Sequence, residues 1–263
     1  MKKKLIITFR LINFTLLQMG ISPKKALIFF KGMPKYISDL IKFRKEFKGN
    51  FELLPCLHDW NEEGGNTKGE YFLQDLHVAR LIFQTNPSKH LDIGSSVEGF
   101  VAHVASFRII YILDVRPISS EIPGIIFNTF DLSSTIDHKD HGSYDSISCL
   151  HALEHFGLGR YGDKIDVNGH IKGLTNMSKL LKNYGLLYLS VPIGIERVEF
   201  NANRVFNPKN IIEICLPLGL ILNKFILIQN SVVTNYENIL DVDFDSLANQ
   251  RYSLGIFIFQ LKN

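Results

Sequence analysis

The chain is poor in cysteine, and its cysteines are far apart. Its 263 residues include only Cys56, Cys149 and Cys215, and no two of them form a C-x-x-C pair. This spacing excludes a disulfide framework and a zinc knuckle, because both need several closely placed thiols. Two of the three cysteines lie in apolar runs, so we expect small buried side chains and a protein of the reducing cytoplasm.

Long uncharged hydrophobic runs are also missing. No stretch is long enough and free enough of charge to cross a bilayer. The apolar run that follows Lys4 is interrupted by Arg10 after five residues, and no clean small-x-small cleavage site comes after it. This pattern argues against a secretory signal and favours helices at the start of the chain.

Basic residues are concentrated at the amino terminus. Residues 1–48 hold twelve of the 29 Lys and Arg residues but only two acids, Asp39 and Glu46. Ser22-Pro23 and Pro34 are typical of helix starts. An apolar stripe runs among the lysines and consists of Tyr36, Ile37, Leu40, Ile41 and Phe47. We predict a basic amphipathic helical arm that binds an anionic membrane surface or a partner; alternatively, it packs on its own domain with its charges solvated.

The rest of the chain divides into a connector and one larger domain. Residues 49–69 are rich in Gly, Asn and Pro, which predicts a connector, and residues 70–263 form the predicted domain. Helices are expected at 71–85, 97–106, 167–181 and 208–216, and the last two strands at 220–228 and 254–261, joined by an acidic loop. No internal repeat is visible. Alternating strands and helices predict an α/β sheet that is mostly parallel, with an antiparallel edge.

The most informative segment, residues 89–103, reads as a buried strand, a tight turn and a helix. The strand ends at Asp92 and is followed by Gly94 and Gly99. The spacing matches neither the phosphate-binding P-loop nor the dinucleotide motif G-x-G-x-x-G. It is nearer to the turn that binds adenosylmethionine, although a turn that binds nothing remains an alternative.

Further acids follow the next strands of the predicted sheet. Asp114 ends an apolar run twenty-two residues after Asp92, a separation typical of a carboxylate that hydrogen-bonds ribose hydroxyls. Asp131 ends a third run. Two more buried strands are expected at 144–150 and 185–191. Because ligands bind at the carboxyl ends of parallel strands, these acids predict a binding site at that edge of the sheet.

This order of motifs resembles class I adenosylmethionine-dependent methyltransferases. More closely, the chain resembles the family called domain of unknown function 268. The segments that carry this resemblance are Tyr71-Phe-Leu-Gln-Asp75, Leu91-Asp-Ile-Gly-Ser-Ser96, Asp114-Val-Arg-Pro117, His151-Ala-Leu-Glu-His155, Gly157-Leu-Gly-Arg-Tyr-Gly-Asp163, Leu189-Ser-Val-Pro192 and Phe200-Asn-Ala-Asn-Arg-Val-Phe206. The resemblance implies a Rossmann-like methyltransferase fold over residues 71–215 and an association with surface-glycan synthesis.

The predicted cofactor is S-adenosylmethionine. Asp92 and the backbone at Gly94 and Ser95 are expected to hold its methionine end, and Gly99 to allow close packing of the following helix. Asp114 is expected to accept the ribose hydroxyls, unless it forms an ion pair with Arg116. The predicted cofactor-binding set is Asp92, Gly94, Ser95, Ser96, Gly99, Asp114, Arg116, Asp131, Leu132 and Leu150. Ser96 departs from the general methyltransferase pattern, which has a second glycine there.

Three residues after the fourth strand are the predicted catalytic group. His155 is the expected base for a hydroxyl acceptor, with Glu154 orienting it and His151 beside them. Alternatively, His155 has only a structural role at a helix start. A rival metal site would combine Asp137, His138, Asp140 and His141 with the two other histidines, but no metal-binding motif supports it, and no metal is predicted.

A polar roof over the same edge is expected to bind the substrate. The predicted substrate-binding residues are Arg160, Tyr161, Asp163, Asn201 and Arg204, where Asn and Asp meet hydroxyls and Arg meets an anionic group. Alternatively, the loop after 156 is folded by its own side chains.

These patterns favour an adenosylmethionine-dependent methyltransferase. The expected acceptor is a hydroxyl, or less favourably an amine, of a glycan or nucleotide-sugar precursor. The expected location is the cytoplasm, peripheral to the inner face of a membrane. A non-catalytic scaffold that retains the fold is the alternative, and a dinucleotide oxidoreductase is disfavoured by the missing G-x-G-x-x-G motif. Nucleic acid is not an expected partner, because the catalytic edge is acidic.

Overall fold

The computed structural model describes residues 12–57, 59, 64–65 and 67–262. The chain divides into two compact units, Met1–Asn66 and Thr67–Asn263. The first residues of the predicted arm, 1–11, and the apolar run interrupted by Arg10 therefore lie outside the described residues. Each unit is considered by itself below.

The described part of the first unit is dominated by one long helix, α2 (Pro23–Glu46). Its start is as predicted, because the Ser22 hydroxyl accepts a hydrogen bond from the backbone N–H of Lys25 at 3.3 Å. The predicted second start at Pro34 is wrong, since Pro34 lies inside the helix. Proline has a helical φ, so the helix continues past it at the cost of one backbone hydrogen bond. None of the described helices is long and apolar enough to span a bilayer.

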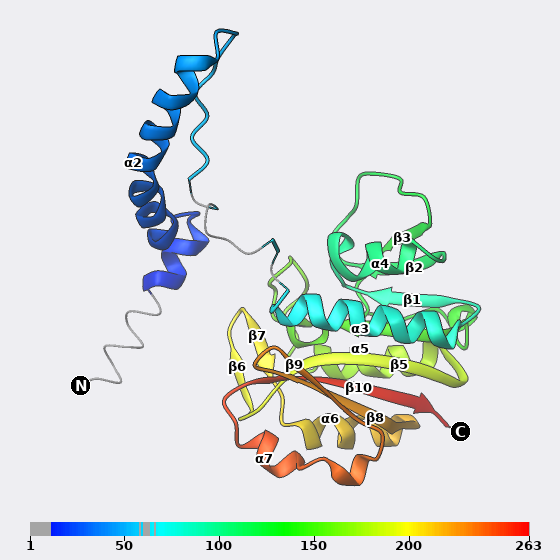
Figure 1. The fold of residues 1–263 in the computed structure, drawn as a ribbon. Helices are drawn as coiled ribbons and strands as arrows, with labels where there is room; N and C mark the ends of the chain where they lie inside the picture. Colours follow the sequence, from blue (N-terminus) through cyan, green and yellow to red (C-terminus); the bar gives the residue numbers. More distant parts are fainter. Residues whose placement is uncertain (1–11, 58, 60–63, 66, 263) are drawn as a thin grey trace. The chain divides into compact units, whose positions relative to one another are not determined.

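The second unit is built on an eight-stranded mixed sheet (Figure 1). Its strands are β1 (His90–Ile93), β2 (Ile110–Asp114), β3 (Ile125–Thr129), β4 (Tyr144–Leu150), β5 (Leu181–Ile193), β8 (Leu220–Gln229), β9 (Val232–Tyr236) and β10 (Ser253–Leu261). They are arranged in the order β3-β2-β1-β4-β5-β10-β8-β9. β1 to β5 pair in parallel, and β10, β8 and β9 are antiparallel, which confirms the predicted fold class. β9 was not predicted.

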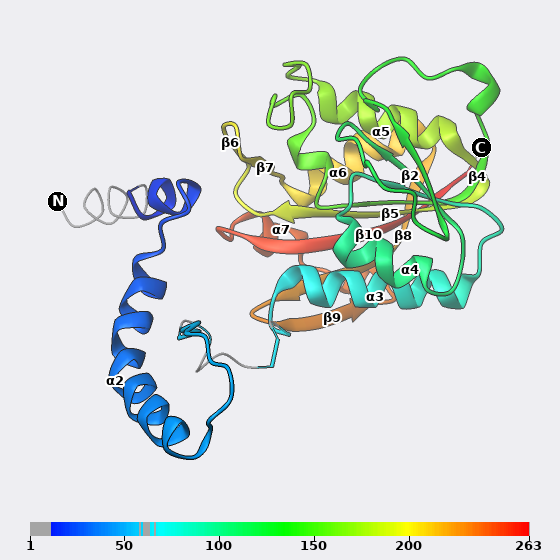
Figure 2. The same cartoon turned by 90° about the horizontal axis from the view of Figure 1, so that it is seen from above.

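Helices cover both faces of this sheet (Figure 2). One face carries α3 (Glu70–Thr85) and α4 (Ala102–Ala105), and the other carries α5 (Gly169–Leu180) and α6 (Pro208–Cys215). The short helix α7 (Phe244–Ala248) lies in the predicted acidic loop. The helix predicted over 97–106 is divided into a π-helical turn, Val97–Val101, and α4, because Gly99 has a non-helical ψ of −111°. Single 3-10 turns cover 138–140, 153–155, 216–218 and 239–241.

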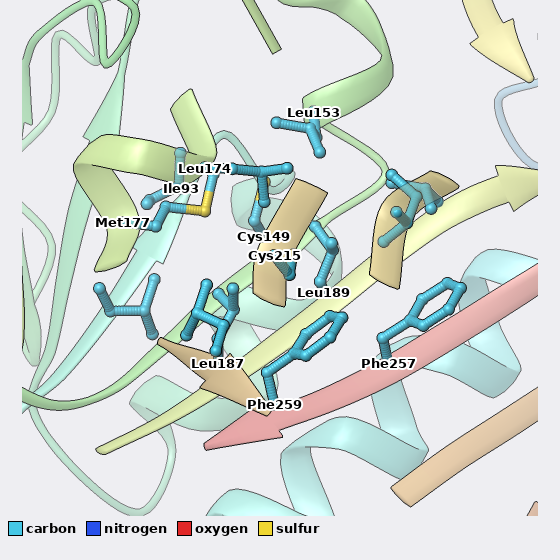
Figure 3. Packing of buried hydrophobic residues seen from close by; sticks show 14 of the residues in the cluster. Ile93, Cys149, Leu153, Leu174, Met177, Leu187, Leu189, Cys215, Phe257 and Phe259 are labelled. Carbon is cyan, nitrogen blue, oxygen red and sulfur yellow. The ribbon is translucent and has the colours of Figure 1, made fainter. Parts of the chain in front are cut away.

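The two faces of the sheet form two hydrophobic cores. Leu187 and Leu189 of β5 point toward α5, where Leu174 and Met177 pack against them, as Figure 3 shows. Phe257 and Phe259 of β10 extend this core. Cys149 and Cys215 are fully buried in it as free thiols, as their apolar surroundings predicted, whereas Cys56 is exposed.

A small hairpin follows β5 and was not predicted. It consists of β6 (Arg197–Glu199) and β7 (Asn203–Val205). The backbone N–H of Phe206 donates to the Pro192 carbonyl at 2.9 Å, and that of Gly194 donates to the Phe206 carbonyl at 2.9 Å. These bonds hold the hairpin at the carboxyl end of β5, which is the predicted functional edge of the sheet.

Candidate functional site

A cavity of about 280 Å³ opens at the carboxyl ends of β1 to β4. Most of the predicted site residues line it: Gly94, Ser95, Ser96, Asp114, Arg116, Asp131, Leu132, Leu150, His151, His155, Arg160, Tyr161 and Asp163. Five do not line it, namely Asp92, Gly99, Glu154, Asn201 and Arg204. The sheet therefore brings together residues from the ends of the four strands β1 to β4, as the positions of their strand ends predicted.

The turn after β1 requires glycine at one position and tolerates serine at another. Gly94 has a φ of +73°, and a Cβ there would lie 2.9 Å from the Cβ of Ala152. Any larger residue would therefore be strained and crowded. Ser96, by contrast, has φ −67° and ψ 133°, an ordinary extended conformation. The departure from the glycine of the general methyltransferase pattern at Ser96 thus costs no backbone strain, and Ser96 lines the cavity.

Asp92 supports the turn from behind. Its carboxyl group is completely buried and accepts hydrogen bonds from the Ser95 backbone N–H at 3.1 Å, the Ser95 hydroxyl at 2.8 Å and the Ser148 hydroxyl at 2.5 Å. Burial raises the pKa of Asp92 to about 7. With three bonds inside the protein and no part in the cavity wall, Asp92 fixes Ser95 and does not reach the predicted methionine end.

Asp114 is placed in the cavity but already has a partner. Its Oδ1 accepts from the backbone N–H of Arg116 at 2.8 Å and from the Arg116 Nε at 3.0 Å, and its Oδ2 accepts from Nη2 at 2.5 Å. A carboxylate has about four acceptor positions, so about one remains. To hold both ribose hydroxyls, Asp114 must lose at least one bond to Arg116, whose side chain is 44% exposed and also donates to the Gly94 carbonyl at 3.2 Å.

Asp131 lines the cavity and also starts a turn. Its Oδ1 accepts from the Ser133 backbone N–H at 2.8 Å and from the Ser133 hydroxyl at 2.7 Å. The next residue, Leu132, is buried, and its carbonyl accepts from the Asn176 side chain at 2.7 Å. Asp131 is therefore a local turn starter that also lies at the cavity wall.

The two histidines after β4 differ in their surroundings. His151 Nδ1 lies 2.8 Å from Glu154 Oε1, while its Nε2 is buried and has no hydrogen-bond partner in the described part of the chain. His151 also has a φ of +52°, which is uncommon for a residue with a side chain and is typical of functional sites. Its ring lies 4.5 Å from that of Tyr71. Glu154 thus orients His151 and leaves its Nε2 without a hydrogen-bond partner among the described residues.

His155 is more fully engaged. Its Nδ1 lies 2.7 Å from the Ala202 carbonyl, and its Nε2 is 3.8 Å from Glu154 Oε1. Burial is the main cause that lowers the pKa of His155, which keeps its ring neutral near pH 7. Because a neutral ring must donate from Nδ1 to the carbonyl, the lone pair is on Nε2, next to Glu154. His155 therefore links the loop after β4 to the β6–β7 hairpin.

Two of the predicted substrate-binding residues, Asp163 and Arg204, stabilise the loop after β4. Asp163 accepts from the backbone N–H groups of Gly157, Gly159 and Tyr161 at 3.0–3.1 Å, so it folds its own loop. Arg204 is 6% exposed and donates to the Phe156 carbonyl at 2.6 Å. Asn201 is exposed at the hairpin tip.

Two roof residues belong to the cavity wall, and one of them, Arg160, also donates from Nη1 to the Ala202 carbonyl at 2.9 Å. Tyr161 and Arg160 line the cavity, and Tyr161 lies between two guanidinium groups, with the Arg116 Cζ at 4.6 Å and the Arg160 Cζ at 5.2 Å from its ring centre. This stack bridges the loop after β4 and the end of β2.

Sequence reasoning missed the contribution of α3. Tyr71, Gln74 and Asp75 of this helix line the cavity. The Gln74 carbonyl accepts from the Ser190 hydroxyl at 2.5 Å, so this polar side chain is buried with a partner. The available signal was the Gln74-Asp75 pair on a helix face otherwise made of apolar residues, since buried polar side chains are rare without a role.

The rival metal site does not gather its ligands. His138 and His141 are neighbours, with ring centres 4.8 Å apart, on the 3-10 turn before β4. In the part of the chain that the structure describes, no three His, Cys, Asp or Glu side chains come together as metal ligands.

The family comparison matches the part of the chain that runs from β3 to the loop after β9. Residues 125–243 match the family described as "Caenorhabditis protein of unknown function, DUF268". The predicted resemblance to this family is therefore confirmed over that range, which includes the loop after β4 and the hairpin. No curated protein matches the chain by sequence.

Two solved structures that share this fold are those of methyltransferases. A putative sarcosine dimethylglycine methyltransferase from Galdieria sulphuraria has a TM-score of 0.51 at 13% identity and covers 72% of this chain and 86% of its own. The N-methyltransferase NodS from Bradyrhizobium japonicum WM9, solved with S-adenosylhomocysteine, has a TM-score of 0.50 at 15% identity and covers 85% and 98%. At such identities the likeness shows the fold, that of class I methyltransferases.

Proposed function

We propose that this protein is an S-adenosylmethionine-dependent methyltransferase. The observation that carries the proposal is the cavity at the carboxyl ends of β1 to β4, in a fold shared with solved methyltransferases. One of those, NodS, was solved with S-adenosylhomocysteine, the demethylated form of the cofactor. In α/β sheets of this kind, ligands bind at that edge.

The residues present fit this cofactor. In this proposal Asp114 binds the ribose hydroxyls, and Asp131 and Leu132, which also line the cavity, meet the adenine. Gly94 brings bare backbone to the cavity, where a Cβ would collide with Ala152. The bound cofactor supplies a methyl group on a positively charged sulfur. The protein's part is to align an acceptor with that methyl group and to remove the acceptor's proton.

In this proposal His151, which lines the cavity, removes that proton. Glu154 accepts from Nδ1, which fixes the tautomer and leaves the lone pair on Nε2, and Nε2 has no other partner among the described residues. A positioned base of this kind contributes roughly 10²- to 10⁴-fold to a rate. His155 was the predicted base, but its Nδ1 is taken by the Ala202 carbonyl and its Nε2 faces Glu154. We therefore assign His155 to positioning.

The acceptor we propose is a hydroxyl of a glycan or nucleotide-sugar precursor. A hydroxyl needs a base, which the His151–Glu154 pair supplies, and Arg160 and Tyr161 at the cavity offer a cation and a ring for an anionic or sugar group. The basic arm supports a place at the inner face of a membrane. Its exposed apolar side chains alternate with lysines on α2, the pattern of helices that lie on anionic lipid.

Calorimetric titration of the full chain with S-adenosylhomocysteine tests the cofactor assignment. We expect micromolar binding, no binding of reduced nicotinamide dinucleotide, and a loss of affinity in Asp114→Asn. In His151→Asn, affinity should be kept, and methyl incorporation from labelled cofactor into an accepted glycan precursor should fall by about 10²-fold or more.

Three results would contradict this proposal. Absence of S-adenosylhomocysteine binding to the folded chain would favour the non-catalytic scaffold. Binding of the dinucleotide would favour an oxidoreductase. Unchanged affinity in Asp114→Asn would remove the ribose assignment. The exposed Lys139→Ala, which lies in the 3-10 turn before β4, is the control for nonspecific charge effects.

A further inference from the structure

Asp75 is a carboxylate that faces the cavity without a cationic partner. It lies on α3 and lines the same cavity as Gly94, Ser95 and Ser96. Its Oδ1 accepts from the Gln74 side chain at 2.9 Å, and the backbone N–H of Phe100 also donates to the carboxylate. These donors fix the side chain in place but do not neutralise its charge.

The backbone of the turn is shaped around this carboxylate. A Cβ built on Gly99 would lie 2.5 Å from Asp75 Oδ2, so only glycine leaves room for it. Gly99 therefore matters because of a side chain on α3, and this close approach holds the carboxylate against the turn that begins at Gly94. The Asp75 side chain is rigidly placed beside the backbone that the cofactor is proposed to contact.

No opposite charge pairs with Asp75 inside the protein. Within the described ranges it forms no salt bridge, and the histidines that interact with it electrostatically are His103 and His151. Burial raises the pKa of Asp75, which is the signature of a carboxylate that lacks a compensating cation. Burying a charge without a partner is costly, so a ligand that brings a positive group to this place gains the missing ion pair.

Asp92, by contrast, is excluded as the carboxylate that pairs with a positive group of the ligand. It accepts three hydrogen bonds inside the protein and has no part in the cavity wall. Asp92, the acid of the D-x-G pattern, thus supports the turn. Asp75, on the preceding helix α3, is the acid that lines the cavity.

We infer that Asp75 is the residue that binds the α-ammonium group of the cofactor's amino-acid end. The inference rests on the proposed function, and it names the anionic partner that the site provides for that group. Asp114 would then hold the ribose and Asp75 the opposite, amino-acid end of the same ligand, both on the wall of one cavity.

Binding of two nucleosides to the full chain tests this inference. S-adenosylhomocysteine carries the ammonium group and, unlike the sulfonium form, has no other positive charge. Methylthioadenosine has the same ribose and adenine but lacks the amino-acid end. We expect Asp75→Asn to weaken binding of S-adenosylhomocysteine by about 10- to 100-fold, the range for a hydrogen bond to a charged group, and to leave binding of methylthioadenosine within about threefold.

Asp114→Asn is the matched control, because it should weaken binding of both nucleosides to a similar extent. Equal losses for both nucleosides in Asp75→Asn, or no loss for either, would overturn the inference while leaving the proposed function intact. If the wild-type chain binds neither nucleoside, the proposed function itself fails.

A second measurement does not depend on the folding of the variant. Deamino-S-adenosylhomocysteine keeps the carboxylate of the amino-acid end but lacks the ammonium group. The wild-type chain should bind it about 10- to 100-fold more weakly than S-adenosylhomocysteine. Equal affinity of the wild-type chain for these two ligands would also overturn the inference.

Discussion

At the scale of single residues, a buried polar network lies beneath the ligand-binding turn. The fully buried His90 ring contacts the Ser146 hydroxyl at 2.6 Å and the Ser148 hydroxyl at 3.1 Å, and Ser148 in turn donates to Asp92. Burial lowers the pKa of His90 to about 3, so the ring is neutral at physiological pH. The network therefore holds Asp92 with neutral donors only.

The raised pKa of Asp92 predicts an unusual dependence of stability on pH. Its folded pKa of about 7 lies above the unfolded value of 3.8, so between these values the folded state holds a proton that the unfolded state releases. This contribution to the free energy of unfolding is present below pH 4 and is lost as pH rises to about 7. Its size is on the order of a few kcal/mol, since one pKa unit corresponds to about 1.4 kcal/mol.

Denaturant unfolding of the wild type and Asp92→Asn at pH values from 4 to 8 measures this effect. The stability of the wild type relative to the variant should fall as pH rises to about 7 and then level off. Other titrating groups, including His90, are common to both chains and cancel in the difference. Two parallel stability curves would show that Asp92 is not responsible.

At the scale of elements, one side chain joins the hairpin to the loop after β4. Arg204 of β7 donates to the carbonyls of Phe156 at 2.6 Å, Glu154 at 3.4 Å and Val167 at 3.4 Å. These three carbonyls belong to one loop, which also carries His155 and Arg160. A buried guanidinium in this position replaces the hydrogen bonds that the loop backbone cannot make to itself.

Arg204→Met should therefore loosen the loop without unfolding the sheet. We expect faster amide hydrogen exchange across residues 154–168, and a loss of about 2–4 kcal/mol in the free energy of unfolding, because buried carbonyls lose their donors. Arg80→Met on the exposed side of α3 is the control and should change stability by less than about 1 kcal/mol. Unchanged exchange in the loop would show that Arg204 does not hold it.

At the scale of the whole molecule, the chain consists of two units, Met1–Asn66 and Thr67–Asn263. The cavity and both hydrophobic cores of the sheet are built entirely from the second unit. On α2, the exposed apolar side chains Leu27, Phe30, Ile37 and Ile41 stand among lysines. The separation of these features predicts that membrane binding and cofactor binding reside in different parts of the chain.

A chain that begins at Thr67 should keep wild-type affinity for S-adenosylhomocysteine but no longer float with liposomes that contain anionic lipid. The full chain should float, and it should be released by salt, because electrostatic attraction is screened. Replacing Lys24, Lys25 and Lys31 by Glu in the full chain is the matched control and should also abolish flotation. Equal flotation of the short and full chains would refute a role for the arm.

The sequence by itself determined the fold class and the edge of the sheet at which the cavity lies. Apolar runs that end in Asp92, Asp114 and Asp131 are local patterns, and parallel strands necessarily gather their carboxyl ends. The helices α3, α5 and α6 began and ended close to the predicted residues for the same reason, since their apolar periodicity and caps are local.

Only the tertiary structure decided which polar side chains face the cavity. Asp75 and Gly99 come from different elements, and their contact arises where α3 packs across the turn. Likewise, Arg204 is turned to the loop after β4 by the β6–β7 hairpin, whereas a sequence pattern marks it only as a polar residue near the site. Such pairings depend on distances between segments far apart in the chain, and strand and helix periodicity carries no information about them.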